Sequence, residues 1–132
     1  MTSTAEPASS LVLVVLEGEI DEPVMLAGLE HAGSLAPPGE GYDVLSDHRG
    51  LVRAVTPDEI VRVLEHIRRS NSPFLGHRWA VVTTAAASYG MMRLMSVHAE
   101  RLPIEVRIFD SVEAARRWLA NRAPPPSRGA GA

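Results

Sequence analysis

Residues 78–119 constrain the fold most, because two kinds of hydrophobic pattern alternate along them. Residues 79–84 form a short apolar and β-branched run, which is typical of a strand buried on both faces of a parallel sheet. Apolar residues then recur with helical spacing over 88–98. Residues 104–109 alternate as a strand does, and Ser111 is a natural N-cap for a last helix. The stretch predicts strand, helix, strand and helix, with the two strands parallel.

The first half of the chain has the same alternation. Residues 11–16 predict a strand, and Asp21 is placed to cap a helix that Gly33 ends. Residues 42–46 predict a second short strand, which we expect to lead into a loop through residues 47–50. The predicted fold is therefore α/β, with a four-stranded, mostly parallel sheet in β-α-β-α-β-α-β-α order.

The clearest local signal is Thr56-Pro57-Asp58-Glu59. Thr56 fits the N-cap of a helix, Pro57 fits the first helical position, and Glu59 completes a capping box three residues later. Apolar residues then fall on one helical face as far as Ile67. This signal predicts a helix that starts directly after Thr56.

Length and composition indicate one domain without a membrane anchor. The chain has 132 residues, no cysteine and a formal net charge of -3. That charge argues against a nucleic-acid surface, and no apolar run approaches the roughly 20 residues needed to span a bilayer. We expect a cytoplasmic protein with a single domain at 11–122. The small, polar residues 1–10 and the Pro/Gly-rich residues 123–132 predict disordered tails.

Four segments of the chain carry a family resemblance. They are YDVLSDHRG at 42–50, TPDEIVRVLEHI at 56–67, RWAVVTTAAASYGMMRLM at 78–95 and EVRIFDSVEAARRWL at 105–119. Together they are similar to the SpoIIAA-like proteins, small bacterial α/β domains related in fold to STAS domains and to the CRAL-TRIO lipid-binding fold. The resemblance covers about residues 11–119. It implies this fold and a regulatory or protein-binding role. No cofactor is expected.

The resemblance also raises a phosphorylation site. STAS relatives that act as anti-sigma-factor antagonists are phosphorylated on Ser or Thr at a helix start, within an Asp-Ser-Ser-Gly-like motif. Thr56 occupies the matching place, but the neighbouring Asp and Gly of that motif are missing. Asp58 and Glu59 would repel a phosphate there, and Arg53 would offset part of that repulsion. A plain helix cap is the favoured interpretation of Thr56.

Polar candidates fall where parallel strands end. Asp47, His48 and Arg49 form the densest cluster, which suits an anion or acid–base chemistry; the favoured alternative is a turn that Asp47 stabilises and a solvated Arg49. Ser88 and Tyr89 open a helix whose free N–H groups suit a phosphate, although ordinary capping is favoured. The histidines show no metal-ligand spacing, so no metal site is expected.

The helix over 88–98 is rich in methionine. Met91, Met92 and Met95 suit an adaptable apolar pocket because the thioether is flexible and polarizable, although plain packing against the sheet is the more common role. Met91 and Met92 are adjacent, so they cannot both face inward. An exposed methionine would favour a partner protein or a second copy of the chain.

Three functions follow from these features. The leading hypothesis is a non-enzymatic regulatory or protein-interaction module that uses the methionine-rich helix or the segment 47–50. The alternative is a carrier or sensor of a small apolar ligand such as a lipid or fatty acid. The third is an enzyme that uses Asp47, His48 and Arg49. No residue is assigned a catalytic role in the first two.

Overall fold

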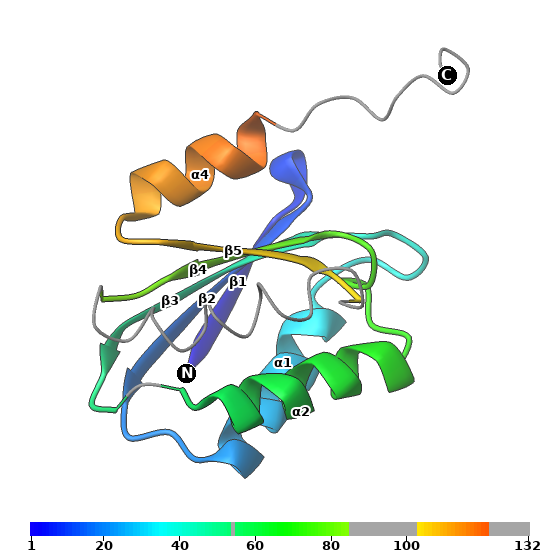
Figure 1. The fold of residues 1–132 in the computed structure, drawn as a ribbon. Helices are drawn as coiled ribbons and strands as arrows, with labels where there is room; N and C mark the ends of the chain where they lie inside the picture. Colours follow the sequence, from blue (N-terminus) through cyan, green and yellow to red (C-terminus); the bar gives the residue numbers. More distant parts are fainter. Residues whose placement is uncertain (54, 85–102, 122–132) are drawn as a thin grey trace.

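A computed structural model describes residues 1–53, 55–84 and 103–121 as one mixed sheet with helices on both faces (Figure 1). The strands are β1 Thr2–Glu6, β2 Leu11–Gly18, β3 Asp43–Leu51, β4 Arg78–Val82 and β5 Glu105–Phe109. The helices are α1 Glu22–Ser34, α2 Pro57–Arg69 and α4 Val112–Ala120, with a 3-10 turn at Pro7–Ser9. None of these helices is both long enough and apolar enough to cross a membrane.

The sheet confirms the predicted α/β class. Its strands follow one another in chain order, β1-β2-β3-β4-β5. The pairs β2–β3, β3–β4 and β4–β5 are parallel, as predicted for the apolar runs. The predicted count of four strands is wrong, because β1 adds an antiparallel fifth strand at the edge and makes the sheet mixed.

β1 corrects the prediction that residues 1–10 are disordered. It pairs with β2 along its whole length, from Thr2 opposite Val15 to Glu6 opposite Leu11. No residue of β1 is fully buried, so main-chain hydrogen bonds rather than a hydrophobic pattern hold it. Arg116 of α4 adds an ion pair to Glu6 at 2.8 Å. The predicted C-terminal tail lies outside the described residues.

β3 is longer than predicted. It runs through residues 47–50, which the sequence pattern assigned to the start of a loop. These polar residues stay in the sheet because β2 pairs with them: Asp47 lies opposite Val15 and Gly50 lies opposite Glu17, with a register shift between the two pairs. Side chains along β3 therefore alternate between the two faces of the sheet as far as Arg49.

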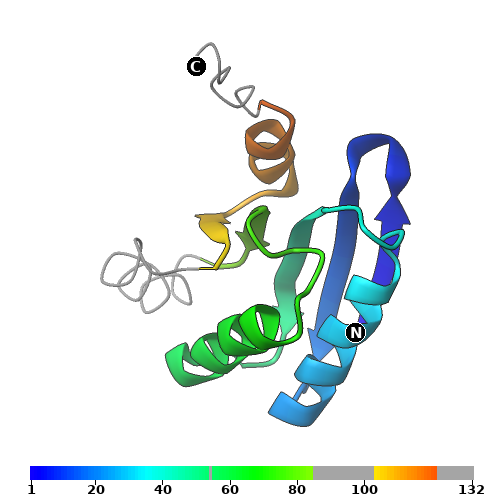
Figure 2. The ribbon, with the colours of Figure 1, turned by 90° about the vertical axis from the view of Figure 1, so that its right-hand side faces the viewer.

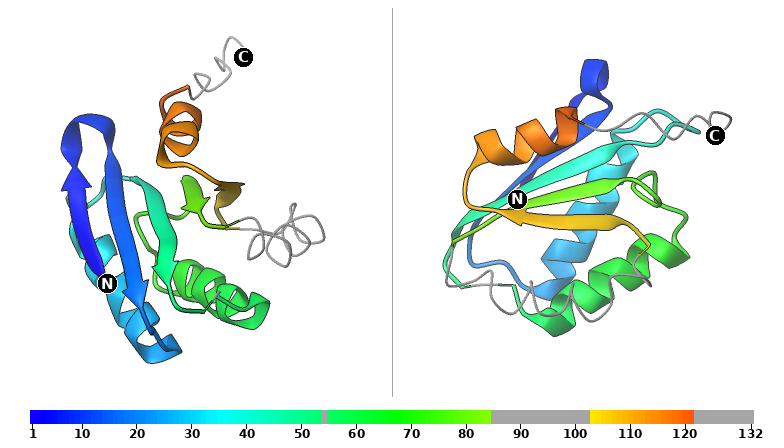
Figure 3. Two further views of the ribbon diagram at one scale, coloured as in Figure 1. Left: turned by 90° about the vertical axis from the view of Figure 1, so that its left-hand side faces the viewer. Right: turned by 45° about the horizontal axis from the view of Figure 1, so that its top comes forward.

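The helices divide the core into two layers. α1 and α2 cover one face of the sheet and α4 covers the other (Figure 2). The larger cluster, under α1 and α2, includes Val12, Ile60 and Trp79; the smaller, under α4, includes Leu45 and Ala115. β1 lies at one edge of the sheet and contacts α1 (Figure 3). The α1/α2 layer is the one that holds the candidate site.

The N-caps predicted at Asp21, Thr56 and Ser111 are confirmed, but α1 ends at Ser34 and not at Gly33, because Gly33 does not adopt the left-handed conformation of a C-terminal glycine cap. Asp21 Oδ1 accepts the Val24 N–H at 3.1 Å, and the Ser111 hydroxyl accepts the Ala114 N–H at 3.2 Å. Thr56 forms the complete capping box with Glu59 at the start of α2. These local signals fix where α1, α2 and α4 begin.

Candidate functional site

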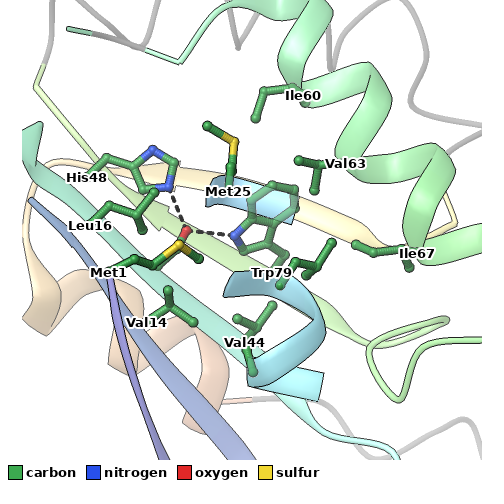
Figure 4. A pocket seen from close by; sticks show the side chains of 13 residues that line it. Met1, Val14, Leu16, Met25, Val44, His48, Ile60, Val63, Ile67 and Trp79 are labelled. Atoms are coloured by element: carbon green, nitrogen blue, oxygen red, sulfur yellow. Dashed lines mark hydrogen bonds between the residues drawn. The ribbon is translucent and has the colours of Figure 1, made fainter. Parts of the chain in front are cut away.

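A cavity of about 50 Å³ lies between the sheet and the helices α1 and α2 (Figure 4). Its walls come from five elements of the core, β2, α1, β3, α2 and β4, and from the first residue of the chain. The lining residues are Met1, Val14, Leu16, Met25, Leu29, Ala32, Val44, Ser46, His48, Ile60, Val63, Ile67 and Trp79. Nearly all of these side chains are apolar, so the space suits an apolar molecule.

The helical part of this wall follows from amphipathic spacing. On α1 the lining residues Met25, Leu29 and Ala32 are four and then three positions apart, so they share one face. On α2 Ile60 and Ile67 lie two turns apart on one face, with Val63 between them. The two apolar stripes meet the same face of the sheet, and the cavity is the space that their side chains leave unfilled.

Three polar side chains of the wall are bonded to one another. The indole N–H of Trp79 donates to Ser46 Oγ at 2.8 Å, and Ser46 Oγ lies 2.8 Å from His48 Nε2 (Figure 4). Ser46 and His48 face the same side of β3 because they are two residues apart. Among the described residues no buried side-chain nitrogen or oxygen lacks a partner. This Ser46–His48–Trp79 chain therefore satisfies its buried polar atoms without a ligand.

His48 is neutral at physiological pH. Burial lowers the pKa of its imidazole from 6.5 to about 4, and the nearby Asp47 carboxylate opposes that shift only in part. A neutral ring keeps the cavity wall uncharged. An uncharged ligand can therefore lie against this wall without contacting a buried charge.

Asp47 and Arg49 do not form one site with His48. They lie on the α4 side of β3, where the Arg49 guanidinium bonds both carboxylate oxygens of Asp47, at 2.9 and 2.8 Å. This pairing lowers the pKa of Asp47. Asp47 also accepts the backbone N–H of Arg49, as the sequence predicted, although within a strand rather than a turn. The predicted polar cluster is thus split between two faces of the sheet.

Thr56 serves the start of α2. Its hydroxyl accepts the Glu59 N–H at 3.2 Å, while Glu59 Oε1 accepts the Thr56 N–H at 2.9 Å. Arg53 makes two further bonds to the Glu59 carboxylate, both at 2.9 Å, and these lower the pKa of Glu59 to about 2. A phosphate on Thr56 would meet this ionised carboxylate, and Arg53 is already engaged with it. The geometry favours the plain cap.

The remaining predicted site residues lie outside the described residues. They are Ser88, Tyr89, Met91, Met92 and Met95, so the methionine-rich pocket and the phosphate site stay predictions. No group of three or more metal-ligating side chains gathers within the described ranges 1–53, 55–84 and 103–121. Sequence reasoning missed the cavity itself, although Ser46 and His48 alternating on an apolar strand were a usable signal of a buried polar pair.

Comparison with known proteins found no similarity that assigns a function. No protein-family model, curated protein or solved structure matches the chain. Function is therefore inferred from the geometry of the cavity and its walls.

Proposed function

We propose that this protein is a non-enzymatic binding domain that takes up a small apolar molecule between its sheet and the helices α1 and α2. One observation carries the proposal: the cavity is apolar, and the Trp79 indole N–H, Ser46 Oγ and His48 Nε2 are bonded to one another in its wall. A ligand there needs no charge and no hydrogen bond. Binding would come from the removal of apolar surface from water.

The size and chemistry of the cavity argue against ordered water as its occupant. About 50 Å³ exceeds the 10–15 Å³ or so that one water molecule needs. A buried water also needs two to four polar partners, and the polar groups here are bonded to one another. Apolar cavities of this kind stay dry and accept apolar guests such as xenon. The resemblance to SpoIIAA-like domains supports the same role through their relation to CRAL-TRIO lipid-binding domains.

A protein-interaction role is the second candidate. It is favoured by Val52, which is 73% exposed and lies two residues after the segment 47–50 that the sequence singles out as a partner surface. The occupant would be another protein or a second copy of the chain. Sedimentation of the purified protein with and without a Val52→Asp change tests the second copy, since a dimer that uses this surface would dissociate in the variant.

Xenon binding tests the proposed cavity function. We expect xenon to shift the methyl NMR signals of cavity residues such as Ile60 in the wild-type protein. A Val63→Ile change adds one methyl group to the wall, so it should remove most of that shift. It should also raise the free energy of unfolding by about 0.5–2 kcal/mol, as filled cavities commonly do.

A matched control separates filling of the cavity from a general change in the core. Val12 is fully buried in the same cluster but does not line the cavity. Val12→Ile should leave xenon binding intact and destabilise the fold by about 1–3 kcal/mol, because the added methyl has no empty space to enter. Absence of xenon shifts in the wild-type protein would overturn the proposed function.

A further inference from the structure

We infer that the ligand is an unbranched alkyl chain, which reaches the cavity by taking the place of the Met1 side chain on Gly28. The inference rests on the proposed function and names the class of molecule. Its basis is the fit between Met1 and α1 at the edge of the cavity. Met1 lines the cavity and is 37% exposed, so its side chain connects the interior with solvent.

The Met1 side chain fills the space between the edge of the cavity and Gly28 of α1, which is called the passage below. A Cβ added to Gly28 would lie 2.3 Å from Met1 Sδ, 2.5 Å from Cε and 3.2 Å from Cγ. Three successive atoms of the methionine thus lie against the bare backbone of the helix. Any chain that takes this place meets the same limit on the Gly28 side, where a methyl branch would collide with α1.

Methionine is itself a model of the proposed occupant. Its side chain is unbranched and has three rotatable bonds, so it resembles a short n-alkyl group and leaves its place at small conformational cost. A chain of similar shape could fill the same passage and extend into the adjoining cavity. Met1 directly precedes β1, an edge strand with no fully buried residue, and its side chain packs against Gly28 of α1. The passage therefore opens without disruption of the main core.

Two six-carbon alcohols of different shape test the inference. We expect 1-hexanol to bind at least about tenfold more tightly than cyclohexanol, because the ring does not fit beside Gly28 and buries fewer of its six carbons. Two methylenes left unburied account for about that difference in affinity. For this test the protein is prepared with ¹³C-labelled methionine methyl groups. A soluble paramagnetic agent broadens the signals of the methyl groups that are exposed to solvent. On addition of 1-hexanol the Met1 methyl signal should broaden, because the side chain moves into solvent, while the Met25 signal should shift without broadening.

Variants at Gly28 sharpen the test. Gly28→Leu places an anchored side chain in the passage, so 1-hexanol binding should be lost while xenon binding is kept. Gly28→Ala should expel Met1 and broaden its methyl signal without any ligand. Both changes replace glycine within a helix, which favours folding. Ala27→Leu adds a comparable side chain at an exposed neighbouring position of α1 and should leave 1-hexanol binding unchanged.

The possible results separate the two proposals. The alkyl-chain inference would be overturned by equal affinities for 1-hexanol and cyclohexanol, or by a Met1 methyl group that stays protected when 1-hexanol binds. If xenon still binds in that case, the proposed function stands. Loss of all binding, xenon included, in the wild-type protein would overturn both.

Discussion

Ser46 Oγ lies 2.8 Å from His48 Nε2, and the two residues share one face of β3 because a single residue separates them. The same hydroxyl accepts the indole N–H of Trp79 from the neighbouring strand. Three polar side chains are thereby buried in an apolar layer with their bonding satisfied. A change to any of these three side chains should therefore alter both the cavity wall and the free energy of unfolding.

Removal of the central hydroxyl should therefore be costly. Ser46→Ala leaves the Trp79 N–H without its acceptor in a buried site, so we expect the free energy of unfolding to fall by about 1–3 kcal/mol. Urea denaturation followed by tryptophan fluorescence measures the loss. Ser70→Ala is the matched control, because the Ser70 hydroxyl donates to His66 O in an exposed position. Equal losses in the two variants would contradict a special role for Ser46.

Acid should destabilise the protein through His48. The folded state holds the pKa of His48 at about 4, below the ordinary 6.5, so the unfolded chain binds more protons between these values. Stability is full above pH 6.5 and falls as the pH drops toward 4, by a total on the order of 3 kcal/mol. Unfolding free energies measured across this range provide the test.

The His48→Gln variant supplies the comparison for this pH effect. Glutamine retains a polar partner for Ser46 but cannot titrate, so the slope between pH 6.5 and 4.5 should become shallower. Below pH 4.5 the Glu59 carboxylate takes over, since its folded pKa is lowered to about 2 and its contribution is lost as the pH falls toward that value. Identical slopes for wild type and variant above pH 4.5 would rule out His48 as the source.

Thr56 should behave as a helix cap and nothing more. Thr56→Ala removes the acceptor of the Glu59 N–H, so we expect a loss of about 1 kcal/mol in the free energy of unfolding. Thr56→Ser keeps the hydroxyl and should stay close to wild type. Thermal and urea denaturation measure both variants. A Thr56→Ser variant as unstable as Thr56→Ala would show that the methyl group, not the cap, matters.

The Asp47–Arg49 pair should be dispensable. Arg49 is nearly half exposed and its partner lies on the α4 side of the sheet, so Arg49→Ala should change stability by less than about 1 kcal/mol. Xenon and 1-hexanol binding should not change, because neither residue lines the cavity. Calorimetric titration checks binding. A clear loss of affinity in this variant would mean that the two faces of the sheet are coupled.

The features that sequence patterns predicted correctly are those that depend on residues close together in the chain. The capping box at Thr56 and the caps Asp21 and Ser111 were read correctly because each is a contact within three residues. The parallel pairing of the four predicted strands was also confirmed.

The errors share one physical cause. β1 has no apolar alternation, and residues 47–50 are polar, so both looked like coil; both are strands because β2 offers them backbone partners. Backbone pairing with a distant strand requires no hydrophobic pattern in the paired segment, so the sequence of that segment does not indicate it. The cavity escaped prediction for a related reason, because it depends on how side chains from five elements fill a shared volume.

The chain-order arrangement of the sheet has a consequence for synthesis on the ribosome. Every strand that emerges finds its neighbour already made, so no strand waits for a distant partner. Among the residues that the structure describes, Trp79 is the last along the chain to line the cavity, and it precedes β5 and α4. The described part of the cavity wall is thus synthesised before α4, the helix that covers the opposite face of the sheet.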